Sequence, residues 1–262
     1  MINKYTCKIK ELQKLKSDIP INLVLSGGAE RGVAHIALLE KLEEMNIKIN
    51  AISGASAGSL VGVMYASGKT PKEILNFFQS HELFQFSWIS LAKRGVFNAE
   101  KYASLLEPHI KSRFEDLEIP LTVCATNLNE GVTEYFNKGH ILKPILASCA
   151  VPGLFNPIEI NNKLYSDGGV LDNFPVTPFK DSLHPVVGSS VFATSKKKNK
   201  ELNTAFKIIS HTFKLSSEAS EEHKLNQTFA TVCFPLDEFS GFDAKEVDAI
   251  YTKAKQYIEK NI

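Results

Sequence analysis

The chain has few cysteines, one tryptophan and no long apolar run. Its 262 residues include four cysteines, with no C-x-x-C pair and no Cys/His spacing typical of a metal site. We therefore expect reduced thiols and neither a metal ion nor a cofactor. No stretch of 18 apolar residues predicts a membrane span, and the first twenty residues lack the apolar segment of a secretory signal. These absences predict a cytoplasmic location. The cysteines are Cys7, Cys124, Cys149 and Cys233.

Net charge is also nearly absent. Thirty Lys and Arg residues against 29 Asp and Glu residues leave a formal charge of +1, so no strong field attracts nucleic acid. The 44% hydrophobic and 23% charged residues are ordinary for a globular protein. One basic run, residues 196–200, has two interpretations: a solvated loop, or a patch that contacts an anionic membrane surface.

The most informative segment that is present is Gly54-Ala55-Ser56-Ala57-Gly58. It matches G-x-S-x-G, with an apolar stretch before it and a helix-capable run after it. A sharp strand-to-helix turn of this kind exposes the serine above the sheet, and its small neighbours let the two arms nearly touch. The pattern favours Ser56 as a nucleophile, although a Gly-rich turn without chemistry has the same letters.

A glycine-rich loop precedes this motif. Residues 21–25 read as a buried strand, residues 27–32 (GGAERG) follow, and residues 33–45 show helical periodicity. A loop between a strand and a helix start presents backbone N–H groups to an anion. The dinucleotide and phosphate-loop spacings are not met, so the oxyanion of an acyl-transfer intermediate is the favoured anion.

An aspartate followed by two glycines, Asp167-Gly168-Gly169, completes the set. Two glycines permit a tight turn with positive φ. By itself this segment is also the pattern of an ordinary Asp-Gly turn.

These three segments, in this order, resemble the patatin-like phospholipases, and the likeness is to small bacterial single-domain members. Three further segments, 124–131, 147–157 and 169–176, are similar to blocks of that family, so the resemblance covers about residues 20–195. It implies a lipolytic serine hydrolase that cleaves acyl esters with a Ser56–Asp167 dyad and no histidine. It also implies that a lipid or small acyl ester is the substrate, with peripheral contact to the membrane. The implied site consists of Ser56 and Asp167, the elbow glycines Gly54 and Gly58, the aspartate-turn glycines Gly168 and Gly169, and an oxyanion loop of Gly27, Gly28, Ala29, Arg31 and Gly32.

One position departs from the family pattern. The third glycine of the family's loop is Ala29 here, and a positive φ at this position would be costly for alanine. The departure bears on the geometry of the oxyanion hole. Arg31 has two interpretations, a phosphate-positioning cation and a structural ion-pair partner.

Alternation of strands and helices predicts a three-layer α/β fold, with a mostly parallel central sheet and helices on both faces. We expect a single domain over 1–262, with a core over about 20–195, a helical cap-like segment over about 71–115 and a C-terminal segment over about 200–262. Expected strands are 21–25, 49–53, 120–125, 186–193 and 230–234, with shorter pieces at 132–137 and 157–165. Expected helices are 33–45, 57–67, 71–79, 99–112, 140–148, 201–225 and 243–260.

Several alternatives stay open on the sequence alone. A catalytic triad could use His184 or His211, which follow Asp167 in the chain. An acyltransferase would use the same dyad, and a non-catalytic lipid-binding module or a nucleotide-binding protein would not turn over an ester. Residues 77–97, rich in aromatic side chains, could line an acyl-chain channel or pack inward.

Overall fold

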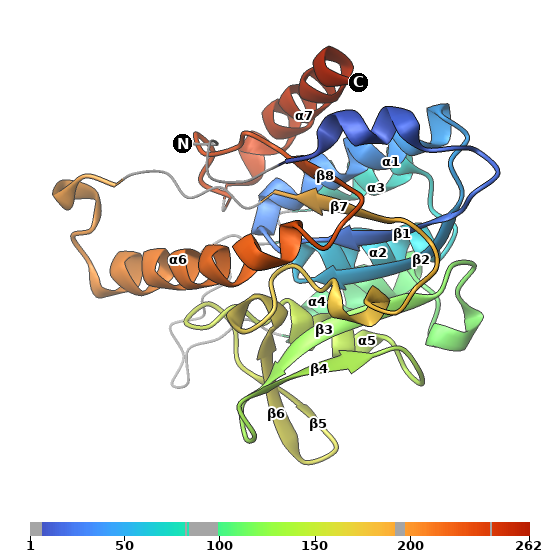
Figure 1. The fold of residues 1–262 in the computed structure, drawn as a ribbon. Coiled ribbons are helices and arrows are strands. Elements are labelled where there is room, and N and C mark those ends of the chain that lie inside the picture. Colours follow the sequence, from blue (N-terminus) through green and yellow to red (C-terminus); the bar gives the residue numbers. More distant parts are fainter. Residues whose placement is uncertain (1–6, 82, 84–98, 192–196, 242) are drawn as a thin grey trace.

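A single sheet of mostly parallel strands forms the centre of the molecule in a computed structural model (Figure 1). The structure describes residues 7–81, 83, 99–191, 197–241 and 243–262. The strand order is β5-β6-β3-β2-β1-β7-β8, and β4 pairs with β3 outside this path. β2, β1, β7 and β8 run parallel to their neighbours, whereas β4, β5 and β6 are joined by antiparallel pairing.

The strands of the described part are β1 (Ile21–Leu25), β2 (Ile49–Ala55), β3 (Leu121–Asn127), β4 (Val132–Phe136), β5 (Ile158–Ile160), β6 (Lys163–Asp167), β7 (Val186–Ser190) and β8 (Ala230–Cys233). The helices are α1 (Ala34–Glu44), α2 (Ala57–Ala66), α3 (Pro71–Ser80), α4 (Ala99–Leu106), α5 (Leu142–Ser148), α6 (Ala205–Leu225) and α7 (Val247–Asn261).

The predicted mostly parallel sheet with helices is confirmed. The strand expected at 157–165 is instead a hairpin, because Asn161 and Asn162 adopt positive φ and reverse the chain between β5 and β6. The helix expected from residue 33 begins as a 3₁₀ turn at Ala29 and becomes α-helical at Ala34.

The two faces of the sheet have separate apolar clusters, as the alternation of side chains along a strand requires. In β1, Leu23 belongs to the large cluster that includes side chains of α1, α2, α3 and α7. Val24 belongs to a smaller cluster on the other face, with Phe174 and with Leu225 at the end of α6. Figure 1 shows that the N-terminal half of α6 extends away from the sheet.

β3 is the strand on which the pieces of the site converge. Its residue Cys124 pairs with Ala55, the last residue of β2, and its next residue, Ala125, pairs with Asp167, the last residue of β6. β2 runs parallel to β3 and β6 runs antiparallel to it, and β4 occupies the opposite side of β3 over this stretch. The carboxyl ends of β2 and β6 therefore meet end to end beside β3.

The aromatic segment at 77–97 is described only in part. Phe77, Phe78 and Leu83 are buried in the large cluster, which supports inward packing for these three. Phe84, Phe86, Trp88, Ile89, Leu91 and Phe97 lie outside the described residues. In the described part of the chain, no helix combines the length and the apolar character needed to cross a membrane.

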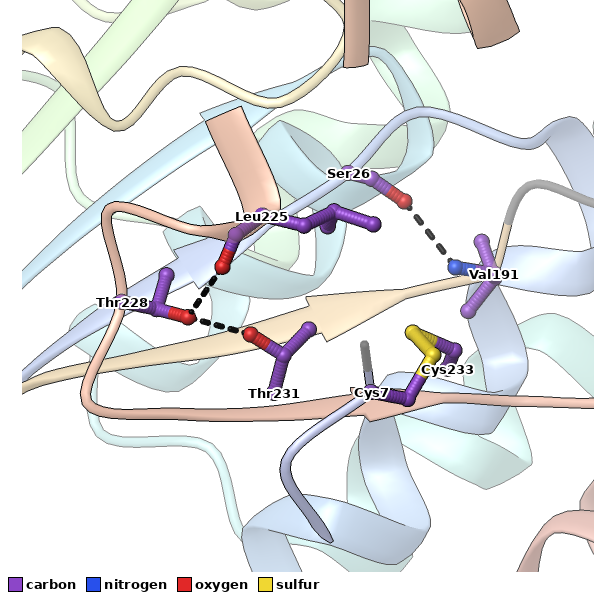
Figure 2. Close-up of a disulfide and its surroundings, with 7 residues drawn as sticks. All are labelled: Cys7, Ser26, Val191, Leu225, Thr228, Thr231 and Cys233. Atoms are coloured by element: carbon purple, nitrogen blue, oxygen red, sulfur yellow. Dashed lines mark hydrogen bonds between the residues drawn. A yellow bond between two sulfur atoms is a disulfide. The ribbon is translucent and has the colours of Figure 1, made fainter. Parts of the chain in front are cut away.

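The expectation of four reduced thiols is wrong for two of them. Cys7 and Cys233 form a disulfide with a Cα–Cα distance of 5.8 Å across 226 positions, beside the edge strand β8 (Figure 2). Lys8 adds a hydrogen bond to the Thr228 carbonyl at 3.0 Å, so the N-terminal segment is fixed to this edge at two points. Cys124 and Cys149 are buried thiols, as expected. The spacing of the cysteines in the sequence did not predict the Cys7–Cys233 disulfide, because the two residues come together only in the folded chain.

We predict that this disulfide contributes about 2–4 kcal/mol to the free energy of unfolding, because it restricts a very long loop of the unfolded chain. Urea unfolding of the wild type with and without reductant measures the effect. Reductant should lower the wild-type midpoint to that of Cys7→Ser, and it should leave the midpoint of Cys7→Ser unchanged. Equal wild-type midpoints in both conditions would contradict the prediction.

Candidate active site

Ser56 occupies a strained turn between β2 and α2. Its backbone has φ 49° and ψ −125°, in the half of the map that residues with a Cβ rarely enter. A non-glycine residue persists in such a conformation only when its surroundings determine it. The Ser56 N–H donates to Ser148 Oγ at 2.8 Å, and the Ser56 carbonyl accepts the Ser59 hydroxyl at 2.7 Å. These contacts from α5 and α2 hold the turn on both sides.

The two glycines of the motif are required by close approach. A Cβ on Gly54 would lie 2.7 Å from the Gly58 backbone, so the arms of the turn touch directly. A Cβ on Gly58 would overlap the Leu25 carbonyl oxygen at the end of β1. The motif thus fixes both the turn and the packing of α2 against the neighbouring strand.

Asp167 is buried at the end of β6. Its Oδ1 accepts the Gly169 N–H at 2.7 Å, and its Oδ2 makes no hydrogen bond of regular geometry within the described residues. Burial raises the pKa of Asp167 to about 7, while interactions with the Ser56 hydroxyl and the Gly169 N–H oppose that rise. The Ser56 hydroxyl is therefore close to the carboxylate, and such contacts commonly tighten only when substrate binds. A Cβ on Gly168 would overlap the Cys124 carbonyl, which explains that glycine.

The glycine-rich loop differs from expectation in one donor. The Gly27 N–H already donates to the Asn173 carbonyl at 3.1 Å, so it is not available to an oxyanion. Within the described residues, the N–H groups of Gly28 and Ala29 make no backbone hydrogen bond outside their own helical turn. Gly32 has a packing role, since a Cβ there would lie 2.5 Å from the Ala57 Cβ.

Ala29 does adopt the conformation that the sequence marks as costly, with φ 53°. The left-handed region costs alanine about 1–2 kcal/mol. The Glu30 N–H donates to the Gly241 carbonyl at 3.0 Å, and the Arg31 N–H donates to the Gly28 carbonyl at 3.2 Å. These bonds hold the turn that contains Ala29.

His35 and Arg31 are buried beside the glycine-rich loop. His35 is fully buried, with Nε2 against the Ser26 carbonyl at 2.9 Å and Nδ1 against Ser189 Oγ at 2.7 Å. Burial lowers the pKa of His35 to about 4, so the ring is neutral and donates from Nε2 to the carbonyl. Burial also lowers the pKa of Arg31 to about 10, although the nearby charge of Glu246 opposes the shift.

Three side chains on one face of α6 bind the segment that follows Asp167. Ser217 donates to the Gly169 carbonyl at 2.6 Å, and Lys224 pairs with the buried Asp172 at 2.6 Å. The third residue, Glu221, accepts from Asn173 Nδ2 at 2.9 Å, and burial raises the pKa of Glu221 to about 7. The sequence contains no local signal for these contacts, because the partners lie about 50 positions apart.

Asn173, which also holds Gly27 through its carbonyl, is thus the link between α6 and the glycine-rich loop. Ser148, at the end of α5, is the other residue that the motifs did not identify. Ser148 and Asn173 lie in segments 147–157 and 169–176, which resemble blocks of the patatin-like family. That resemblance was the only signal for them in the sequence.

Ser56 and Asp167 line the same small pocket. Its volume of about 30 Å³ can hold a water-sized group but not an acyl chain. No histidine lines this pocket among the described residues. The other lining residues are Gly28, Ala29, Arg31, Val151, Asn173, Phe213 and Lys214.

Comparison with known proteins agrees with this architecture. Residues 23–180 match the family model described as patatin-like phospholipase, which is more than half of the chain. The chain therefore belongs to the patatin-like phospholipase family.

Individual relatives share about a third of their residues with this chain over the matched segment. Lysophospholipase NTE1 of Cryptococcus neoformans is 32% identical over 173 residues, 62% of this chain and 10% of that protein. An uncharacterized NTE family protein of Mycobacterium tuberculosis is 33% identical over 162 residues, 60% of this chain and 45% of that protein. The chain thus spans less than half the length of these curated relatives. The crystal structure of VipD from Legionella pneumophila has the same fold, with a TM-score of 0.54 at 17% identity over 92% of this chain and 67% of that one.

We predict that Ala29→Gly leaves the free energy of unfolding unchanged or raises it by up to about 1 kcal/mol, because glycine has no penalty at positive φ. Ala37→Gly is the matched control, since Ala37 is equally buried but lies within the regular helix α1. There the change should cost about 1 kcal/mol or more. Chemical denaturation of both variants measures the contrast, and equal losses would contradict it.

Proposed function

We propose that this chain is a lipolytic serine hydrolase that cleaves acyl esters through a Ser56–Asp167 dyad. The observation that supports it is the meeting of two strand ends on β3: a serine held at positive φ and a buried aspartate are brought to one pocket. Family membership supports a lipid ester as the substrate.

Asp167 would act as the general base. A carboxylate with an ordinary pKa is a weak acceptor for an alcohol proton, and burial that raises the pKa to about 7 makes it a better one. Ser56 loses its proton to Asp167 and attacks the ester carbonyl, and the alcohol leaves with that proton. Water, activated by the same carboxylate, then releases the acyl group.

The oxyanion would be bound by the N–H groups of Gly28 and Ala29, at the edge of the pocket that Ser56 enters. Backbone donors of this kind commonly contribute about 3–4 kcal/mol to acyl transfer. Because the Gly27 N–H is engaged with Asn173, Gly27 would instead keep the loop in place. Arg31 lines the same pocket, and its N–H donates to the Gly28 carbonyl at 3.2 Å, so we assign it the loop-supporting role.

An acyltransferase would use the same residues with a different final acceptor, and a lipid-binding module would retain the pocket without turnover. The cytoplasmic location stays a prediction of the sequence. The Cys7–Cys233 disulfide weighs against it, since disulfides persist mainly in oxidising compartments.

Fluorophosphonate labelling with intact-mass readout tests the nucleophile. We expect one adduct on the wild type, none on Ser56→Ala, and labelling of Asp167→Asn slowed by at least about a hundredfold, because general-base assistance is lost. Asp181→Asn, an exposed carboxylate, is the matched control and should label at the wild-type rate. An adduct on Ser56→Ala would overturn the assignment.

The same assay separates a dyad from a histidine triad. His184→Ala and His211→Ala should keep wild-type labelling rates, because neither side chain lines the described pocket. Loss of labelling in one well-folded histidine variant would favour a triad instead.

The pH profile provides a second test. Asp167 accepts a proton only when it is ionised, so kcat/KM for a short soluble ester should fall about tenfold per unit below pH 7 and level off above it. Glu221 and Lys214 also have pKa values of about 7 in this region. Glu221→Gln and Lys214→Gln should therefore keep the midpoint of the profile. A midpoint that moves with either variant would assign the titration to that residue.

A further inference from the structure

Helix α6 has two opposite faces, and one of them packs against the active-site segment. Ser217 and Glu221 are buried against the active-site segment, and Phe213, one turn earlier, lines the pocket of Ser56. These positions repeat every four residues and share one face. Ile208 and Leu215 lie on the opposite face of the helix.

Three large aliphatic side chains in the N-terminal half of α6 are exposed. Ile208, Ile209 and Leu215 are 48%, 55% and 48% exposed. Ile208 and Leu215 are seven positions apart and therefore lie on the same side, opposite Phe213 and Ser217. Ile209 is four positions before Phe213, so it lies beside Phe213 in the exposed N-terminal half of the helix. Figure 1 shows this N-terminal half of α6 extending beyond the sheet.

Positive charge gathers at the N-terminal end of α6, whereas its C-terminal half carries Glu218, Glu221 and Glu222. Residues 197–215 contain five lysines and one glutamate, a net charge of +4. The whole chain has a net charge of +1, so the remainder sums to −3. Lys198, Lys200 and Lys207 are exposed at the start of α6 and in the turn before it. The only acidic residue of this segment, Glu201, is paired with Lys197.

We propose that the exposed N-terminal half of α6, with the aliphatic residues Ile208, Ile209 and Leu215 and the neighbouring lysines Lys198, Lys200 and Lys207, docks onto an anionic lipid surface. Aliphatic side chains beside lysines are the composition of helices that lie in the interface of a membrane, and lysines near an anionic surface each add attraction. The charge argues against a second copy as the occupant, since two such faces would repel each other.

The position of this surface on α6 connects docking with catalysis, and this part of the inference rests on the proposed function. Phe213 and Lys214 line the pocket of Ser56, and Ile209 lies one helical turn before Phe213. One turn advances about 5.4 Å along the axis. A docked α6 would therefore place the pocket close to the lipid surface, so that an acyl ester need not cross water to reach it.

The test measures binding of Ser56→Ala protein to vesicles by sedimentation, so that no lipid is consumed. Vesicles of phosphatidylcholine alone are compared with vesicles that contain about three parts in ten of phosphatidylglycerol. We expect binding only to the anionic vesicles, and we expect it to weaken as salt is raised. Binding that is equal on the two vesicle types would overturn the proposal.

Two sets of substitutions locate the surface. Ile208→Ser combined with Ile209→Ser should weaken vesicle binding at least tenfold, whereas Leu183→Ser, at a fully exposed leucine outside α6, should not change it. Lys198→Gln, Lys200→Gln and Lys207→Gln together should weaken binding about a hundredfold. The matched control, Lys48→Gln, Lys72→Gln and Lys180→Gln, removes the same charge elsewhere and should have little effect. Equal losses in the test and control sets would overturn the proposal.

Hydrolysis of a short soluble ester separates this inference from the proposed function. In the catalytically intact protein, both α6 variants should keep wild-type turnover of the soluble ester and lose turnover of vesicle lipid. Absence of soluble-ester turnover in the wild type would count against the proposed function alone, since vesicle binding is measured without catalysis. If the isoleucine variant changes the oligomeric mass but not vesicle binding, the face is a contact between copies and the proposal is wrong.

Discussion

The arrangement of the site depends on the way β2 and β6 share one side of β3. β2 ends at Ala55 opposite Cys124, and β6 arrives from the other direction and ends at Asp167 opposite Ala125. Hydrogen bonding to the single strand β3 therefore places the carboxyl ends of β2 and β6 next to each other, although they are more than 100 positions apart in the sequence. This pairing also determines the positions of the turns that follow, at Ser56 and at Gly168.

The strain at Ser56 and Ala29 can be understood in the same way. Both residues have a Cβ and both adopt positive φ, at the turns that follow β2 and β1. These neighbouring parallel strands are locked together, with Leu25 opposite Gly54, and Gly58 packs against the Leu25 carbonyl. Tight packing of this kind leaves the two turns no relaxed conformation, so the folded core supports their backbone cost.

A second layer of contacts comes from α6. Asn173 donates to Glu221 and also accepts the Gly27 N–H, so one residue connects α6, the segment after Asp167 and the glycine-rich loop. The helix that holds the site through Ser217, Glu221 and Lys224 exposes aliphatic and basic side chains in its N-terminal half. Structural support and surface contact are thus combined in one element.

The sequence by itself identified the segments that form the turns at Ser56, at Asp167 and in the glycine-rich loop, because such tight turns require glycine and other small residues. It also determined the mostly parallel sheet, through the alternation of strands and helices. Only the tertiary structure decided that the Gly27 N–H is occupied, that Ser148, Asn173 and Glu221 support the site, and that Cys7 meets Cys233. These contacts join segments whose distance in space depends on the packing of the whole chain, and no local pattern of residues encodes that distance.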